Sequence, residues 1–253
     1  MKLSVVIITF NEEKNIGRCL ENIQTIADEI IVLDSFSTDK TEDFCKQYDA
    51  QFYQQKFLGY TDQKNKALSY ATNDFVLSMD ADETLSDDLK KSILAEKQSG
   101  FSADAFVMSR CTSFCGHFIK HGSWYPDKKL RLFNKTKGGW VGENVHEKVE
   151  MQNGTSIKKL DGDMLHYSYY SLEEVILQNN KYTTIQAEAM FKKGKKGSWI
   201  KLAINPLWAF ISGYIFRLGF LDGTDGFFIA SSVAYQTMTK YAKLRKLHKN
   251  SNA

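Results

Sequence analysis

Residues 4–10 read SVVIITF, a charge-free run dominated by β-branched residues. Strands buried on both faces of a parallel sheet have this continuous apolar pattern, whereas strands with one wet face alternate. Residues 11–24, NEEKNIGRCLENIQ, follow directly, and their apolar side chains recur at the spacing of an amphipathic helix. The opening of the chain therefore predicts a buried strand that leads into a helix, with Asn11 at the helix start.

The same alternation continues over the first 110 residues. Further strands are predicted at 29–34, 51–55 and 74–80, and further helices at 41–48 and 61–71. Strands and helices that alternate at this short period are typical of βαβ units. We therefore expect an α/β fold with a Rossmann-like, mostly parallel sheet flanked by helices. Ligands of such sheets bind outside the carboxyl ends of the strands.

After residue 100 the pattern changes. Residues 104–110 predict one more strand, and residues 111–165, rich in aromatic residues and glycine, are expected to be mostly loop. Residues 171–196 predict a long helix, because Ser171 and Glu174 have the spacing of a capping box at its start.

Charge is distributed unevenly along the 253 residues. The formal net charge is +3, but residues 190–253 contain 11 Lys/Arg and 2 Asp/Glu, a local charge of +9 that leaves −6 for the other 189 residues. A basic end behind an acidic body indicates contact with an anionic surface or polymer.

The basic end also contains an apolar segment. Residues 202–216 carry no charge and include LWAFISGYIF, but the segment is shorter than the roughly 20 residues of a membrane-spanning helix and contains Asn205-Pro206. Lysines lie on both sides of it. We expect a helical, basic extension that lies on an anionic membrane surface. The alternative is a buried helical hairpin with a solvated basic end.

The chain has four cysteines, and its first ten residues lack the small-residue cleavage site of a secretory signal. We therefore expect free thiols and a cytoplasmic protein, peripheral on the inner face of the cytoplasmic membrane. Cys111, Cys115, His117 and His121 raise the alternative of a zinc site, although structural zinc sites usually separate their ligand pairs more widely.

Polar residues follow the predicted strands where each one ends. They are Thr9, Asn11 and Glu12 after the first strand, Asp34 after the second, and Asp80, Asp82 and Glu83 after the strand at 74–80. A parallel sheet brings such ends to one edge. Because Mg²⁺ and Mn²⁺ prefer carboxylate oxygens and bind substrate phosphates, Asp80-Ala81-Asp82 predicts a divalent metal site. Asp161-Gly162-Asp163 has the same form but is expected to be a loop.

Known nucleotide fingerprints are absent from the sequence. No G-x-G-x-x-G follows the first strand, and there is no G-x-x-x-x-G-K-[ST]. A bound nucleotide would therefore be held by side chains and a metal ion.

Four segments together resemble the nucleotide-sugar half of family 2 glycosyltransferases with the GT-A fold. They are SVVIITFNEEKNIGRCLENI (4–23), IIVLDSFSTDKT (30–41), QKNKAL (63–68) and DFVLSMDADE (74–83). The resemblance implies that Thr9, Asn11, Glu12 and Asp34 hold the nucleoside, that Lys64 and Asn65 lie near the diphosphate, and that Asp80 and Asp82 bind ribose and metal. Ser35 stands where the family commonly has a second Asp, so no role is carried over to that position.

The second half of the chain resembles bacterial lipopolysaccharide-core β-1,4-glucosyltransferases. The segments are GHFIKHGSWYPDKKLRLF (116–133), GENVHEKV (142–149), LHYSYYSLEE (165–174) and GFLDGTDGFFIA (219–230). The resemblance implies an inverting transferase that uses Mg²⁺ or Mn²⁺ and moves a hexose, glucose, from UDP to a lipid-linked saccharide such as the lipopolysaccharide inner core. Another cell-surface polysaccharide or lipid-linked precursor is the alternative acceptor, and no nucleic acid is expected as a partner.

An inverting transferase needs a base that deprotonates the acceptor hydroxyl. Asp127, Glu143, His146 and Glu147 are the candidates, and the resemblance favours Glu147. His166 is expected to complete the metal shell or bind phosphate, with a buried core histidine as the alternative.

The acceptor side is assigned more loosely. Lys120, His121, Trp124, Asp127 and His146 are expected to meet the acceptor or a phosphate. We expect residues 1–110 to bind the nucleotide sugar, 111–190 to form the acceptor side of the same domain, and 191–253 to contact the membrane.

Two other classes of function compete. A glycoside hydrolase would use Asp80 and Asp82 as its acid pair, although residues two apart rarely flank one bond from opposite sides. A non-catalytic protein that binds nucleic acid would use the basic, aromatic C-terminal end.

Overall fold

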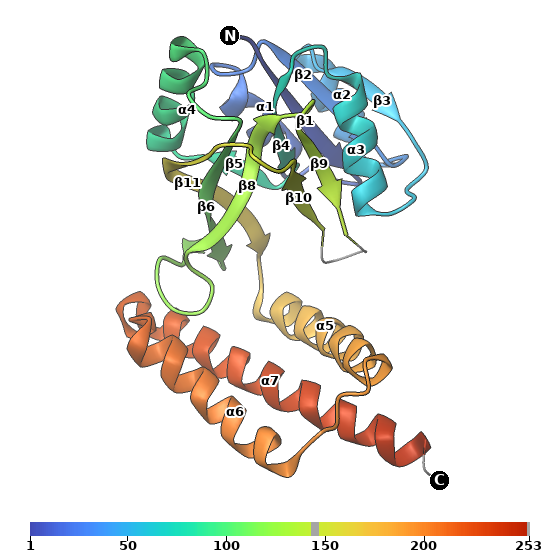
Figure 1. Cartoon of the computed structure of the whole chain (residues 1–253), viewed down its shortest axis with the longest axis vertical. Helices are drawn as coiled ribbons and strands as arrows, with labels where there is room; N and C mark the ends of the chain where they lie inside the picture. Colours follow the sequence, from blue (N-terminus) through green and yellow to red (C-terminus); the bar gives the residue numbers. More distant parts are fainter. Residues whose placement is uncertain (143–146, 252–253) are drawn as a thin grey trace. The chain divides into compact units, whose positions relative to one another are not determined.

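The computed structural model describes residues 1–142 and 147–251 (Figure 1). The chain packs into two compact units. The sheet unit comprises Met1–Arg110 and Asp127–His166, and the helical unit comprises Cys111–Pro126 and the residues from Tyr167 onward. This is a division of packing, so the expected division of functions over 1–110, 111–190 and 191–253 stays a prediction.

The sheet unit begins with a parallel half. Its strands are β1 (Leu3–Thr9), β2 (Glu29–Asp34), β3 (Gln51–Gln54) and β4 (Phe75–Asp80), in the spatial order β3-β2-β1-β4. The connecting helices are α1 (Ile16–Ile23), α2 (Thr41–Gln47) and α3 (Tyr60–Tyr70). The expectation of an α/β fold with helices flanking a Rossmann-like sheet is confirmed.

Beside β4 the same sheet continues with antiparallel pairing, in the order β8-β6-β11-β5. These elements are β5 (Glu83–Leu85), β6 (Ala105–Phe114), β8 (Asp127–Asn134) and β11 (Ile157–Tyr169), with α4 (Asp87–Ser99) after β5 and the short β7 (His117–Phe118) paired to β6. A separate hairpin joins β9 (Gly138–Val141) to β10 (Lys148–Met151). The expectation that residues 111–165 are mostly loop is therefore wrong.

Residues 161–163 correct a second expectation, because Asp161-Gly162-Asp163 lies inside strand β11 and not in a loop. Gly162 has φ +93°, and a Cβ atom there would come within 2.2 Å of the backbone nitrogen of Leu89. Glycine therefore allows β11 to pass directly against the start of α4. The close backbone approach explains why a glycine stands at position 162.

The core explains the continuous apolar run of β1. Val5 and Ile7 pack with the α1 residues Ile16 and Leu20 on one face of the sheet. Val6 packs with the α3 side chains on the other face. Both faces are covered by helices, so every residue of β1 is buried except Ile8, which is partly buried.

Helix α1 starts later than expected, at Ile16 with Asn15 as its N-cap. Asn11 lies outside the helix with φ +53°, and its side-chain oxygen accepts a hydrogen bond from the Thr38 amide at 2.9 Å. Asn11 therefore ties the turn after β1 to the turn after β2 instead of capping the helix.

The helical unit consists of α5 (Leu172–Lys192), α6 (Trp199–Ile211), a π-helical turn η1 (Ser212–Phe216), a 3-10 turn η2 (Gly219–Asp222) and α7 (Gly223–Ser251). The serine half of the capping box is confirmed, because Ser171 Oγ accepts from the Glu174 amide at 3.3 Å. The Glu174 carboxylate accepts from the amide of Tyr170, the residue before the N-cap, at 2.6 Å. Helices α6 and α7 run side by side (Figure 1). The expected helical C-terminal extension is confirmed.

No single helix within the described residues is long and apolar enough to cross a bilayer. The helical segments Trp199–Phe216 and Gly219–Ser251, which are bent by 74° relative to each other, are together long and apolar enough to cross a bilayer by length and composition alone.

Asp104 provides a test of how the sheet unit is held together at its edge. Its carboxylate accepts from Lys137 Nζ at 2.6 Å and from the Ser156 amide at 2.9 Å, and these contacts lower its pKa to about 2. An Asp in an unfolded chain has a pKa of about 4. The lowered folded-state pKa therefore adds stability above about pH 4, which is lost as the pH falls toward 2.

We expect Asp104→Asn to lower the thermal unfolding midpoint at pH 7, with a difference from wild type that shrinks as the pH falls from about 4 to about 2. Asp161→Asn is the matched control, because the exposed Asp161 carboxylate has no hydrogen bond or ion pair among the described residues. Thermal unfolding followed by circular dichroism at several pH values measures both variants. A pH-independent difference for Asp104→Asn would contradict the assignment.

Candidate active site

Strand register brings the predicted polar residues to one edge of the parallel half. Thr9 lies opposite Asp34, and Asp34 lies opposite Gln54 on β3. On the other side of β1, Asp80 lies opposite Ile8, the residue before Thr9. The carboxyl ends of β1, β2 and β4 therefore deliver Thr9, Asp34 and Asp80 to neighbouring positions, as the sequence predicts.

Two turns above this edge are fastened to each other. The fully buried Asp34 carboxylate accepts from the Ser37 amide at 2.7 Å and from Gln54 Nε2 at 3.5 Å. The Asn11 amide donates to Ser37 Oγ at 2.7 Å. Thr9 Oγ1 is buried and has no hydrogen-bond partner among the described residues. It is a polar group for which a bound ligand could supply the partner.

Glu12 stands close to the Asp-x-Asp segment. Its carboxylate accepts from Asn15 Nδ2 at 2.8 Å. Burial raises the pKa of Glu12, and the negative charges of Asp82, Asp39 and Asp80 raise it further against the effect of that hydrogen bond. The carboxylates after β1 and β4 thus share one acidic region.

Asp80 is held between two buried cations. Lys64 Nζ lies 3.0 Å from Oδ1, and Arg131 Nη2 lies 3.0 Å from Oδ2. Burial opposes ionisation, but the two cations outweigh it and hold the pKa of Asp80 far below its usual range. Asp80 therefore stays ionised and cannot serve as a general acid at neutral pH.

A tryptophan covers these two cations. The Trp140 ring centroid lies 4.3 Å from Lys64 Nζ and 5.1 Å from the Arg131 guanidinium carbon. The Asn65 side chain holds the backbone of Trp140 in place. Its Nδ2 donates to the Trp140 backbone carbonyl at 2.8 Å, and its Oδ1 accepts from the Trp140 backbone N–H at 3.0 Å. The structure thus uses Asn65 to position Trp140, and its predicted contact with a diphosphate stays a prediction.

Glu83 extends the ionic network toward the antiparallel half of the sheet. This fully buried carboxylate accepts from the Asp80 amide at 2.9 Å and lies 3.4 Å from Arg131 and 3.7 Å from Arg110. Arg110 in turn binds Asp127 Oδ2 through Nη2 at 2.8 Å. Glu83 is a buried member of strand β5 that links the two arginines.

The network contains residues that sequence reasoning missed. Arg131, Arg110 and Trp140 come from segments expected to be loop or ordinary strand. Arg131 could have been noticed as a lone arginine between Leu130 and Leu132, since an arginine in an apolar strand is seldom buried without a charged partner. Its Nε and Nη1 atoms are buried without a partner among the described residues.

Asp82 lies beside His166, for which the sequence leaves a metal ligand, a phosphate contact and a core histidine open. Asp82 Oδ2 lies 3.1 Å from His166 Nε2, and strand register supports the contact because His166 lies opposite Glu83 in the β5–β11 pair. Two donors on one octahedral ion with bonds of about 2.1 Å lie about 3 Å apart. The pair therefore fits a Mg²⁺ or Mn²⁺ ion, although the described residues contain no group of three protein ligands.

Glu147 lies beside the same lysine that holds Asp80. Its Oε1 is 3.6 Å from Lys64 Nζ, and its Oε2 is buried without a partner in the described part of the chain. Of the other candidate bases, Asp127 has both oxygens engaged, by Arg110 and by Lys129 at 3.1 Å. Glu143 and His146 lie outside the described residues.

The remaining acceptor candidates belong to the helical unit. The His121 amide and Nδ1 contact Asp222 at 2.9 Å each, and the Lys120 amide donates to the same carboxylate at 3.4 Å. Trp124 packs between Phe114 and Tyr169. The acceptor roles of Lys120, His121 and Trp124 stay predictions.

The described residues do not support the zinc alternative, because they contain no group of three or more His, Cys, Asp or Glu side chains that could hold a metal ion. Cys111 is buried and its Sγ donates to the Ile119 carbonyl at 3.3 Å. His117 and His121 each use Nδ1 to contact a separate aspartate, Asp225 and Asp222. The histidines are therefore directed to carboxylates of η2 and of the start of α7, and not to the cysteines.

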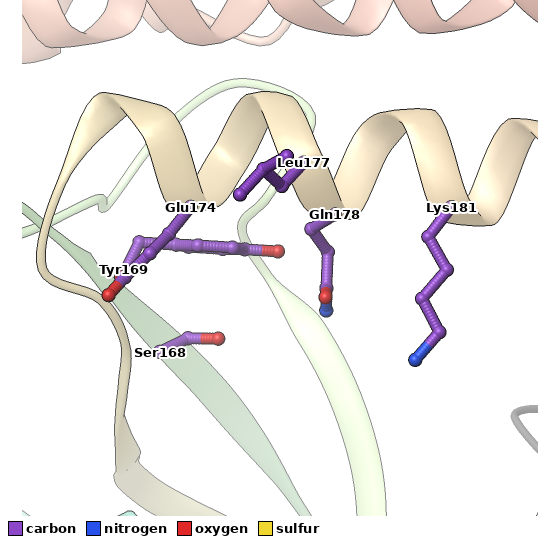
Figure 2. Close-up of a pocket in the computed structure, with 6 residues that line it drawn as sticks. All are labelled: Ser168, Tyr169, Glu174, Leu177, Gln178 and Lys181. Atoms are coloured by element: carbon purple, nitrogen blue, oxygen red, sulfur yellow. The ribbon is translucent and has the colours of Figure 1, made fainter.

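A hollow of about 330 Å³ lies under α5 in the helical unit (Figure 2). Its lining comprises Ser168, Tyr169, Glu174, Leu177, Gln178 and Lys181. Figure 2 shows the side chains of Gln178 and Lys181 extending from α5 on the side where Ser168 lies. An aromatic ring beside hydroxyl, amide and ammonium groups is chemistry suited to a saccharide.

Comparisons with known proteins agree with this geometry. Residues 4–163 match the family model described as glycosyl transferase family 2. An uncharacterized glycosyltransferase of Rickettsia typhi is 33% identical over 97% of this chain and 87% of its own length. The lipopolysaccharide core biosynthesis glycosyltransferase LpsC of Rhizobium meliloti is 29% identical over 98% of this chain and 93% of its own length.

Solved structures add a likeness of fold. The crystal structure of S. aureus TarS aligns with 97% of this chain and 55% of its own chain, with a TM-score of 0.50 and 16% sequence identity. At this identity the likeness concerns the fold alone.

The ionic network predicts energetic coupling between Arg131 and Glu83. Arg131→Met leaves the buried Glu83 and the partly buried Asp80 with less positive charge, so we expect it to lower the free energy of unfolding by about 3 kcal/mol. Glu83→Gln removes part of that uncompensated charge, so the double variant should cost at least about 1 kcal/mol less than the sum of the single variants. Urea unfolding of the four proteins measures the coupling.

Lys128→Met, on the exposed side of the same strand, is the control and should change the free energy of unfolding little. Strict additivity of Arg131→Met and Glu83→Gln would mean that the two side chains do not share a network.

Proposed function

Because this chain belongs to glycosyl transferase family 2, we propose that the carboxyl edge of its parallel strands transfers a hexose from a nucleoside diphosphate sugar to a saccharide acceptor. The protein is a glycosyltransferase. The proposal concerns its donor, its metal ion, its catalytic base and its acceptor. The observation that carries the proposal is the convergence of Thr9, Asp34 and Asp80 in adjacent strand registers, with the Asp82–His166 pair directly after them.

We assign the nucleoside to the turns after β1 and β2. Thr9 has a buried hydroxyl without a partner among the described residues, and the Asp34 carboxylate is held rigidly by its own loop. Asn11 and Glu12 complete this side of the site. Lys64 and Asn65 face the diphosphate in the proposal, and Asp80 faces the ribose, since its oxygens are already held by two cations.

Asp82 and His166 would hold a Mg²⁺ or Mn²⁺ ion, with diphosphate oxygens supplying further ligands. When bound, such an ion neutralises the diphosphate and, as a Lewis acid, stabilises the negative charge of the departing group. The mixed donor set of one carboxylate and one imidazole favours Mn²⁺ over Mg²⁺, because imidazole nitrogen suits transition metals.

Glu147 is the proposed base. Its Oε1 contacts Lys64 and its Oε2 has no partner among the described residues, so the side chain is anchored at one oxygen and can accept a proton at the other. Glu147 takes the proton of the acceptor hydroxyl while that oxygen forms a bond to C1 of the sugar. The bond from C1 to the diphosphate oxygen breaks on the opposite face, and the nucleoside diphosphate leaves with the electron pair. The anomeric centre is inverted.

The donor and acceptor follow from family resemblance and from one relative. UDP-glucose is the proposed donor, and a lipid-linked saccharide such as the lipopolysaccharide inner core is the proposed acceptor. LpsC, similar along nearly the whole chain, is named for lipopolysaccharide core biosynthesis. We assign Lys120, His121, Trp124, Asp127 and His146 to the acceptor side, with the hollow under α5 as a further saccharide contact.

Metal and donor binding are tested by Asp82→Asn and His166→Asn. We expect Asp82→Asn to lower the rate of glucose transfer by at least about a hundredfold and to abolish the thermal stabilisation by UDP with Mn²⁺. His166→Asn should weaken stabilisation by UDP with Mn²⁺ more than stabilisation by UDP with Mg²⁺. The exposed Asp88→Asn is the control. Unchanged stabilisation of Asp82→Asn by UDP with Mn²⁺ would remove Asp82 from the metal site.

The base is tested by Glu147→Gln. A general base contributes roughly 10²–10⁴ to the rate, so turnover should fall by that factor while UDP with Mn²⁺ still stabilises the protein against heat. Glu150→Gln, an exposed glutamate nearby on β10, should leave both properties unchanged. Transfer is measured by release of UDP from UDP-glucose in the presence of detergent-solubilised glycolipid. If Glu147→Gln retains wild-type turnover, another group is the base.

A further inference from the structure

Helix α6 exposes its apolar side chains, whereas an ordinary surface helix buries them against the core. None of its 13 residues is buried, and Ile200, Ile204, Leu207 and Trp208 form an exposed stripe along one face. Leu207 and Trp208 are 62% and 60% exposed. The polar side chain of Asn205 points the other way, toward α7, where it donates to the Tyr241 hydroxyl at 3.0 Å.

The apolar surface continues around the connection between α6 and α7. The exposed side chains here are Ile215, Phe216, Leu218, Phe220, Leu221 and Phe227, which together we call the apolar tip. Leu218 adopts φ +59°, a left-handed conformation that is strained for a leucine. The fold therefore holds an apolar side chain outward at a conformational cost.

Close glycine contacts make the apolar tip rigid. A Cβ atom on Gly226 would lie 1.8 Å from the Gly219 carbonyl oxygen, and one on Gly219 would lie 2.7 Å from the Gly213 carbonyl oxygen. The start of α7 and the two short turns are thus packed backbone against backbone. The apolar side chains of these turns are presented at the surface.

Negative charge is kept away from this surface. No Asp or Glu occurs between Glu188 and Asp222, and Asp222 and Asp225 are the only acidic residues from there to the C-terminus. Both are engaged, Asp222 by His121 and Asp225 by His117, at 2.9 Å each. The carboxylates nearest the apolar tip are therefore directed to histidines within the helical unit.

Positive charge gathers at the other end of α6. The exposed lysines Lys192, Lys193, Lys195, Lys196 and Lys201 surround the start of the helix, and Lys246 and Lys249 belong to the end of α7. The two segments meet, because His248 Nε2 lies 2.9 Å from the Lys195 carbonyl oxygen and the His248 ring packs on Phe191. We call these seven residues the lysine cluster.

We propose that α6 and the apolar tip immerse in the interface of an anionic lipid bilayer, with the lysine cluster on its headgroups. An exposed apolar stripe with tryptophan, free of negative charge and bordered by lysines, matches a membrane interface in both polarity and charge. The cytoplasmic leaflet of a membrane has a negative surface potential. We therefore propose that the positively charged lysine cluster contacts this leaflet. The inference is independent of the catalytic assignments and concerns where the transferase meets a lipid-linked acceptor.

Vesicle flotation of the full-length chain tests the proposal. We expect binding to vesicles of phosphatidylcholine with phosphatidylglycerol, weaker binding to phosphatidylcholine alone, and loss of binding as salt rises. Leu207→Gln with Trp208→Gln should lower the bound-to-free ratio at least about tenfold. Lys193→Gln with Lys196→Gln should lower it about tenfold on anionic vesicles only.

Matched controls separate this surface from general effects. Leu58→Gln with Ile157→Gln removes equally exposed apolar side chains from the sheet unit, and Lys91→Gln with Lys128→Gln removes the same charge there. Both control pairs should bind vesicles like wild type. Because all the replaced side chains are at the surface, thermal unfolding midpoints and hydrolysis of UDP-glucose without vesicles should stay unchanged for every variant.

Tryptophan fluorescence locates the contact. Trp199 and Trp208 lie on α6, so brominated phospholipids should quench the fluorescence of wild type and quench Trp208→Phe less. Absence of wild-type binding to anionic vesicles, or equal binding by Leu207→Gln with Trp208→Gln, would overturn the proposal. A wild-type dimer in solution that becomes monomeric in that variant and ignores vesicles would also overturn it, since the face would then bind a second copy.

Discussion

The position of Asp80 between Lys64 and Arg131 is the constraint on which the rest of the sheet unit depends. A partly buried carboxylate at the end of a central strand is unfavourable unless cations and hydrogen bonds compensate it. Lys64 comes from α3 in the parallel half, and Arg131 comes from β8 in the antiparallel half. Their shared contact with one carboxylate, under the Trp140 ring, therefore joins the two halves of the sheet directly beside the carboxylate edge.

The same arrangement gives the neighbouring carboxylates Asp80, Asp82 and Glu83 different partners. Asp80 is saturated by its cations, Glu83 is buried against two arginines, and Asp82 points to His166. Three carboxylates within four positions thus have three different environments. Of the three, Asp82 is the one in contact with an imidazole, a group that can bind a metal ion, which is why we propose the ion at Asp82 and the ribose at Asp80.

The parallel half was predictable because its signals are local. The β1 run, the α1 spacing and polar residues at strand ends can be read within short windows, and topology then brings Thr9, Asp34 and Asp80 together. Arg131 and Trp140 were missed, because β8 and β9 reach the site through antiparallel pairing between distant segments. Strand β11 was missed because its few apolar residues do not alternate and Gly162 resembles a turn residue. For α6 the composition was readable, but not that Asn205 faces inward and Trp208 outward.

A crystal structure of the protein with UDP and Mn²⁺ tests the central claim most directly. We expect the uridine at the turns after β1 and β2 beside Thr9 and Asp34, the ribose near Asp80, and the ion bound by Asp82, His166 and the diphosphate. A nucleotide bound away from this edge, or an ion held without Asp82, would contradict the proposed site.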